Sequence, residues 1–112
     1  MKNSQSLKKN ADFQNVYQYG KSFANKYLVM YVKKNDLGIN RIGISVSKKV
    51  GNSVKRNRAK RLMKESYRKI EDKLPLGYDF IIIARNTING KKCADVEKSL
   101  NSAFKRTGVR KK

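Results

Sequence analysis

The chain has 112 residues, of which 28 are Lys or Arg and eight are Asp or Glu, and its formal net charge is +20. This length is typical of one domain with one hydrophobic core. A small domain needs a net charge of only about 2–8 for solubility, so the excess indicates a polyanionic partner. No run of about 18 apolar residues is present, and no expected helix pairs its basic residues with a broad apolar face. These patterns favour nucleic acid over a membrane.

The residue types that usually carry hydrolytic chemistry are scarce. The chain has no histidine, the commonest general base and metal ligand. Its carboxylates are scattered, whereas a two-metal nuclease site needs several that converge. A single cysteine, Cys93, excludes an internal disulfide and a cysteine-cluster zinc site. We therefore expect no catalytic residue, no metal site and no bound cofactor in the protein. The lone cysteine and the polar first ten residues predict a cytoplasmic location.

The N-terminal part of the sequence is expected to form a flexible segment followed by a helix. Residues 1–9 are polar and basic and are expected to be flexible. Asn10 is expected to cap a helix that begins near Ala11. The stripe of that helix has three- and four-residue spacing: Phe13, Val16, Tyr17 and Gly20. Core packing is the more probable role of Val16, whereas Phe13 and Tyr17 can both pack and stack on a base.

The strands are expected at four places. Residues 21–24 predict a short edge strand, and residues 26–33 predict a longer strand that is apolar on both sides. Residues 41–47 alternate between apolar and small polar side chains, so a ligand could approach the sheet closely on the polar side. Residues 78–85 form the most apolar segment and predict an internal strand.

Residues 48–69 contain ten of the basic residues and a single acid, Glu65. Asn52 or Ser53 can cap a helix from about Val54 to Ile70. The apolar stripe of this helix is Ala59, Leu62, Met63, Ser66 and Ile70. The opposite face carries Asn57, Arg61, Lys64 and Arg68, flanked by Arg56, Lys60 and Arg58. Charged helix faces are often merely solvated, but such faces usually mix signs, and arginine is well suited to grip phosphate. The pattern therefore favours phosphate binding.

A final helix is expected at residues 94–105, followed by a loose basic tail at residues 106–112. The element order is helix, two or three strands, helix, strand, helix. Without a long linker or an internal repeat, this order predicts a single α+β domain that comprises residues 1–112 and contains one sheet.

The segment KKVGNSVKRNRAKRLMKESYR resembles the signature of the protein subunit of bacterial ribonuclease P. The segments ADFQNVYQYG, RIGISVSKK and YDFIIIAR also resemble that family, in the same order, so the resemblance covers nearly the whole chain. Ala59 departs from it, because the family usually has Val or Ile there.

The resemblance implies an α-β-β-β-α-β-α sandwich with a central four-stranded sheet and a left-handed βαβ crossover, which is a ribosomal protein S5 domain 2-like fold. It also implies a function: removal of the 5′ leader from precursor tRNA by a ribonucleoprotein endonuclease. The catalytic site and its Mg²⁺ ions are then expected in the RNA subunit, which the protein assists by raising affinity for substrate and metal. The expected partners are the catalytic RNA and precursor tRNA, with no membrane and no required protein partner.

The resemblance and the charge pattern together suggest two sets of site residues. The residues expected to bind the catalytic RNA are Lys49, Arg56, Asn57, Arg58, Lys60, Arg61, Lys64 and Arg68. Those expected to bind the leader, in a cleft between the first helix and the sheet, are Phe13, Tyr17, Tyr31, Ser45, Lys48 and Arg85. Tyr27 or Tyr19 could take the place of Tyr31. Two other classes of protein are weighed: a non-enzymatic RNA-binding module such as a ribosomal or RNA-chaperone protein, and a protein-only nuclease, which the missing histidine and the scattered acids disfavour.

Overall fold

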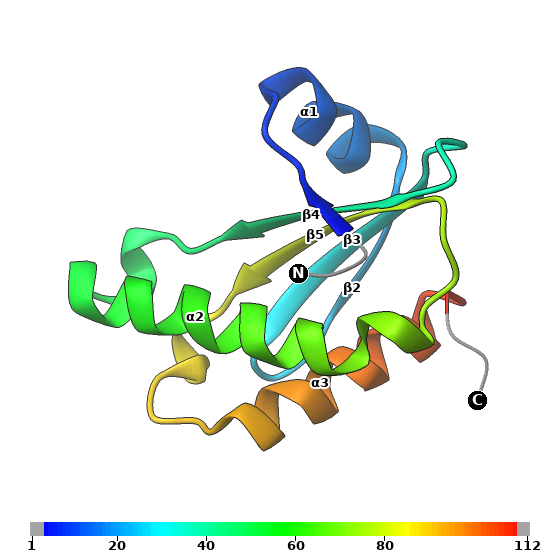
Figure 1. The fold of residues 1–112 in the computed structure, drawn as a ribbon. Coiled ribbons are helices and arrows are strands. Elements are labelled where there is room, and N and C mark those ends of the chain that lie inside the picture. Colours follow the sequence, from blue (N-terminus) through cyan, green and yellow to red (C-terminus); the bar gives the residue numbers. More distant parts are fainter. Residues whose placement is uncertain (1–3, 110–112) are drawn as a thin grey trace.

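The computed structural model of the protein describes residues 4–109. A mixed sheet lies between one helix on one face and two helices on the other (Figure 1). The strands are β1 (Ser4–Ser6), β2 (Lys21–Ala24), β3 (Leu28–Lys34), β4 (Asn40–Ser45) and β5 (Tyr78–Ala84). The α-helices are α1 (Asn10–Tyr19), α2 (Ser53–Ile70) and α3 (Cys93–Arg106), and the short 3₁₀ helices are η1 (Lys48–Val50), η2 (Glu71–Lys73) and η3 (Asn86–Ile88).

The sheet has the strand order β1-β4-β5-β3-β2. Strand β4 runs parallel to both of its neighbours, β1 and β5, whereas β5 with β3 and β3 with β2 are antiparallel pairs. Helix α2 therefore connects the parallel strands β4 and β5, which is a βαβ crossover. The α+β class with one sheet is confirmed, and the left hand of the crossover stays a prediction of the resemblance.

The larger core lies between the sheet and the helices α2 and α3. Helix α2 buries Ala59, Met63, Ser66, Tyr67 and Ile70. Helix α3 contributes its own three- and four-residue stripe: Val96, Leu100, Ala103 and Phe104. Aromatic rings link the layers, because the Phe80 ring of β5 packs edge-on against Phe104 with the centroids 5.0 Å apart. The predicted stripe of α2 is thus mostly correct, but it omitted Tyr67, which is fully buried.

A smaller core lies under α1 on the other face, where Leu7, Val16 and Ile81 are buried. A Cβ atom at Gly43 would lie 2.6 Å from the Phe13 ring, so glycine is what lets α1 approach β4. The sequence suggested that a ligand could approach the sheet beside the small residues of β4. At Gly43 the side chain of Phe13 takes that place instead.

A buried ion pair holds α1 and the sheet together on this side. The Arg41 guanidinium donates to both carboxylate oxygens of Asp79, with Nε–Oδ1 and Nη2–Oδ2 distances of 2.7 Å. Arg41 also reaches Asp12 of α1 at 3.3 Å, and the Asn35 amide donates to Asp79 at 2.8 Å. The hydrogen bond to Asp79 raises the pKa of Arg41 above its ordinary value, against the opposing effect of burial.

Three sequence-based expectations need correction. The sheet has five strands rather than four, because Ser4–Ser6 pairs in parallel with Asn40–Ile42. Within the expected flexible tails, Leu7 and Val109 are buried, and residues 1–3 and 110–112 lie outside the described part of the chain. Asn10 is already helical, and the preceding residue, Lys9, makes no side-chain capping bond.

Candidate RNA-binding surface

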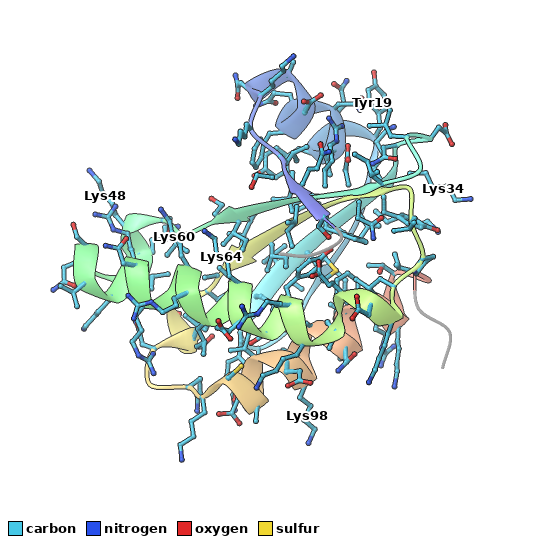
Figure 2. All side chains as sticks on the ribbon, in the orientation of Figure 1. Tyr19, Lys34, Lys48, Lys60, Lys64 and Lys98 are labelled. Carbon is cyan, nitrogen blue, oxygen red and sulfur yellow. The ribbon has the colours of Figure 1, made fainter. Side chains whose placement is uncertain are left out.

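The turn between β4 and α2 presents two lysines at one end of the molecule. Ser47 caps η1 by accepting a hydrogen bond from the Lys49 amide at 3.3 Å. Asn52 caps α2 by accepting from the Lys55 amide at 3.0 Å. Gly51 between them has a φ of 142°, which L-residues with a side chain rarely adopt. These local bonds leave Lys48 and Lys49 exposed where the strand meets the basic helix, and Figure 2 shows Lys48 at that end.

The outer face of α2 is cationic along its length, as predicted. The residues that the structure places in solvent are Lys55, Asn57, Arg58, Lys60, Arg61, Lys64, Arg68 and Lys69. They diverge to two sides. Lys60 and Lys64 point toward the side of the sheet on which α1 lies (Figure 2). Arg58 and Arg61 instead line a hollow of about 340 Å³ beside Cys93, at the start of α3.

Two predicted phosphate ligands have partners within the protein. Arg68 donates to both oxygens of Glu65 at 2.8 Å, so the one acid of the basic helix neutralises its C-terminal arginine. Arg56 is half-buried and donates to Ser53 at 3.3 Å. Both side chains are less available to a ligand than the remaining residues of the predicted set. Glu65 stands three residues before Arg68, a spacing from which the pair could have been predicted.

The loop between β5 and α3 is bonded to the start of the basic helix. The Asn89 side chain donates to the Val50 carbonyl at 2.7 Å, and Arg58 donates to the Lys91 carbonyl at 3.0 Å. These bonds give the loop, η1 and the first turns of α2 a common position. The sequence identified the turn at Asn89 but gave no sign of these contacts.

The aromatic residues of the predicted leader site do come together. Phe13 and Tyr17 of α1 lie with ring centroids 6.3 Å apart, and Tyr17 packs edge-on against Tyr31 of β3 at 5.0 Å. All three are half-buried, so each ring packs on the smaller core and also presents atoms to solvent. Burial, with a smaller contribution from Tyr31, raises the pKa of Tyr17 above its ordinary value.

Beyond these rings, the same sheet face continues with accessible residues. In register across β4, β5 and β3 lie Ser45, Ile83 and Val29, all half-buried. Arg85 follows β5, and its guanidinium donates to the Asn25 carbonyl at 2.6 Å while its side chain stays exposed. The structure therefore places Ser45 and Arg85 on or beside this face, at the end of β4 and β5 that leads to η1.

Tyr27 joins this surface, although the sequence reading named it only as a substitute for Tyr31. The ammonium groups of Lys26 and Lys91 lie 5.7 and 5.4 Å from the centroid of its ring. An aromatic ring flanked by cations can stack on a base while the ammonium groups meet phosphates. The alternation of residues 26–33 places Tyr27 on the same side as Tyr31, so periodicity alone could have found it.

One hollow joins the two predicted sets of residues. A space of about 230 Å³ is lined by Phe13 from α1, by residues 42–44 of β4, and by Lys60 and Lys64 from α2. Phe13 was expected to meet the leader, and the two lysines were expected to meet the catalytic RNA. Because they share a hollow, the aromatic rings and the cationic helix form one continuous surface that an RNA strand could cross.

Neither a metal-ligand cluster nor a membrane-spanning helix is found in the described part of the chain. Between residues 4 and 109, no three or more Cys, Asp and Glu residues are grouped so that they could hold a metal ion. None of the helices in that range is long and apolar enough to cross a membrane. The arrangement of lysines, arginines and aromatic rings can bind polyanions and stack on bases.

Comparison with known proteins assigns the chain to a family. A family model described as Ribonuclease P matches residues 1–108. The chain is 54% identical over 105 residues to the ribonuclease P protein component of Clostridium acetobutylicum, covering 92% of this chain and 88% of the relative. It is 50% identical over 107 residues to that of Clostridioides difficile, covering 95% and 94%.

Solved structures agree with the sequence relatives. The RNase P protein of Staphylococcus aureus superposes with a TM-score of 0.83 at 39% identity, covering 94% of this chain and 96% of that one. The RNase P protein of Thermotoga maritima gives a TM-score of 0.81 at 30% identity, with coverage of 91% and 96%. The chain therefore belongs to the ribonuclease P protein family.

Proposed function

We propose that this protein is the RNA-binding subunit of a ribonuclease P ribonucleoprotein, in which it assists a catalytic RNA in removing the 5′ leader of precursor tRNA. The observation that carries the proposal is the continuous surface formed by the cationic face of α2, η1 and the uncovered part of the sheet with its aromatic rings. Family membership supports the partnership with the catalytic RNA and disfavours a ribosomal or RNA-chaperone role.

Within this proposal the cationic helix meets the folded catalytic RNA. Lys49, Asn57, Arg58, Lys60, Arg61 and Lys64 contact its phosphates, and Arg56 and Arg68 contribute less because of their partners within the protein. Arginine side chains on a rigid helix are suited to bidentate phosphate contacts. In this proposal the hydrolysis and its Mg²⁺ ions belong to the RNA, as the family resemblance implies. The protein would act in the cytoplasm.

The leader would cross the uncovered sheet face. Phe13, Tyr17 and Tyr31 stack on its bases, Ser45 donates or accepts a hydrogen bond, and Lys48 and Arg85 meet its phosphates. Stacking contributes about 1–3 kcal/mol per base whatever the base is, which suits a leader of variable sequence. Tyr27 extends this track toward η3 with the two lysines that flank its ring.

The test is reconstitution with a catalytic RNA of the family at low Mg²⁺ concentration, with leader removal as the readout. Wild-type protein is expected to activate cleavage, and Arg61→Glu is expected to weaken assembly with the catalytic RNA. Phe13→Ala should leave assembly intact and lower affinity for leader-bearing substrate by about 5–100-fold, the loss of roughly one stacked base. Lys98→Glu, on the exposed side of α3, is the charge-matched control.

Two results would contradict the proposal. Cleavage of precursor tRNA by the purified protein without RNA would place the active site in this chain. Equal affinity of the reconstituted wild-type complex for precursor and mature tRNA would show that the protein does not bind the leader.

A further inference from the structure

A second basic surface lies at the end of the sheet away from η1. The C-terminus of α1, the first residue of β2, the last residues of β3 and the first residue of β5 surround a hollow of about 270 Å³. Figure 2 shows Tyr19 and Lys34 at this end and Lys48 at the opposite end of a molecule that measures 36 × 31 × 24 Å. None of these residues belongs to the surface described above. We call Tyr19, Lys21, Lys33, Lys34 and Tyr78 the distal surface.

The distal surface gathers positive charge without a counter-charge. Lys21, Lys33 and Lys34 all line the hollow. Among residues 4–109, none of the three forms an ion pair, and the only hydrogen bond from their side chains joins Lys33 Nζ to the Lys34 carbonyl at 3.1 Å. Asp79, which follows Tyr78, is already paired with Arg41. Three ammonium groups around one hollow repel each other, and an anion placed among them relieves that repulsion.

Two aromatic side chains, Tyr19 and Tyr78, also line this hollow. Tyr19 is 67% exposed, so core packing does not account for its ring. Tyr78 is half-buried and its ring stacks on Phe80 with centroids 5.9 Å apart and planes 11° apart, which holds it in one orientation. An exposed ring and a fixed ring that line the same hollow as three lysines form a combination that can bind the bases and phosphates of single strands.

The size of the hollow narrows the choice of ligand. Sites for small organic molecules usually enclose about 300–1,000 Å³, so this hollow is at or below the small end of that range. A single base or phosphate of a longer polymer fits that size better than a complete dinucleotide cofactor. The rest of the polymer would extend beyond the hollow, past the exposed side chains of Lys21 and Lys34.

We propose that the distal surface binds a single-stranded RNA segment, with a base stacked on Tyr19 and phosphates at Lys21, Lys33 and Lys34. Because this surface and the start of α2 lie at opposite ends of the protein, the segment is either a separate part of the RNA or the far part of a strand that crosses the molecule. The identity of that RNA, catalytic RNA or precursor tRNA, rests on the proposed function, whereas the RNA binding itself does not.

The first experiment maps contacts in the reconstituted complex. In a Cys93→Ser background, Lys34→Cys carries a photo-crosslinker, and Lys98→Cys carries the same group as the matched control. We expect crosslinks from position 34 to unpaired nucleotides that exceed those from position 98. Crosslinks to the 5′ leader identify precursor tRNA as the ligand, and crosslinks that persist without precursor identify the catalytic RNA. Yields at position 34 no higher than at position 98 would overturn the proposal.

The second experiment measures the charge contribution. The double variant Lys21→Gln, Lys34→Gln removes two phosphate contacts. The negative slope of log affinity against log salt should therefore become less steep by about 1.4 for single-stranded RNA. The wild-type advantage over this double variant should then shrink about sevenfold as salt rises from about 50 to about 200 mM. Lys98→Gln should leave the slope unchanged. An unchanged slope in the double variant would contradict the proposal.

The two proposals fail in different ways. If the wild-type protein did not activate the catalytic RNA but position 34 still crosslinked to RNA, the proposed function would fall and the distal surface would stand. If the protein fully activated the catalytic RNA but position 34 did not crosslink to RNA, the proposed function would stand and the distal-surface proposal would fall. Tyr19→Ala adds a test of the aromatic contact, because it should weaken RNA binding without changing the salt slope.

Discussion

Replacing Arg41 by methionine should destabilise the fold far more than the loss of one surface charge would. Arg41 makes two 2.7 Å bonds to Asp79, whose side chain is only 2% exposed, and the Arg41 side chain is 21% exposed. Methionine keeps much of the aliphatic volume and removes the fork of donors. Among the described residues, Asp79 would then keep one side-chain hydrogen bond, from the Asn35 amide at 2.8 Å. The contact from Arg41 to Asp12 of α1 would also be lost.

The expected cost follows from the burial of the carboxylate. Removing one partner of a buried ion pair typically costs about 3–5 kcal/mol, because the other charge stays desolvated. Arg41 is partly accessible, so water can replace some of its contacts, and we expect a loss of about 2–4 kcal/mol. With a urea dependence of about 1.5 kcal/mol per molar, the midpoint of unfolding should fall by roughly 1.3–2.7 M.

Urea unfolding followed by circular dichroism, at fixed salt and without added RNA, measures this change. The matched control is Arg68→Met, which removes an arginine from an equally short pair whose side chains are 58% and 45% exposed. That variant should lose less than ~0.5 kcal/mol. Adding Asp79→Asn to Arg41→Met should recover part of the loss, because it removes the isolated charge. Equal effects of Arg41→Met and Arg68→Met would refute the reasoning.

Three further predictions follow from single positions. Burial raises the pKa of Tyr67 to about 12. The folded state therefore keeps a proton that the unfolded state loses above pH ~10, and stability should fall by about 2–3 kcal/mol between pH ~10 and ~12. Urea unfolding over that range should show a smaller fall for Tyr67→Phe, and an equal fall would contradict this assignment. In Gly43→Ala the new Cβ would lie 2.6 Å from the Phe13 ring and displace it, so filter binding should show weaker retention of leader-bearing substrate with unchanged assembly. Gly51→Ala should cost about 1–3 kcal/mol in thermal unfolding, because φ is 142° and the Cβ would lie 2.6 Å from the Lys55 side chain.

The sequence predicted the helices well because their apolar periodicity is strong. The stripe of α2 was read from Ala59, Met63 and Ile70, all of which are buried. Tyr67 was left out of the predicted stripe, although it stands four residues after Met63. In the structure, the hydroxyl is satisfied inside the protein by Ser4 at 2.7 Å. A buried tyrosine needs such a partner, and that partner lies 63 residues away in the chain.

Strand β1 could not be predicted from composition. Ser4, Gln5 and Ser6 show no apolar alternation, and the strand is held by backbone pairing with β4 and by the burial of the next residue, Leu7. Backbone hydrogen bonds leave no pattern in the side chains. The resemblance did not supply this strand either, because the four-stranded description omits it.

The sequence predicted the chemical character of the candidate site but not its individual contacts. Charge and periodicity placed Arg61 and Lys64 on the exposed face of α2, where the structure has them. They did not show that Phe13 fills the space beside Gly43, because that contact depends on the Phe13 rotamer and on how α1 sits on the sheet, neither of which periodicity encodes. The pairing of Arg68 with Glu65 was also missed, although the three-residue spacing could have indicated it.

The short polar strand at the start of the described chain also has a protective consequence. By pairing with Asn40–Ile42, it occupies a row of backbone donors and acceptors that would otherwise border the sheet. A bare parallel border of this kind invites pairing with another molecule and aggregation. N-terminally shortened versions that begin at Leu7 should therefore self-associate even though they keep this buried leucine, and preparations of this protein should retain Ser4–Ser6.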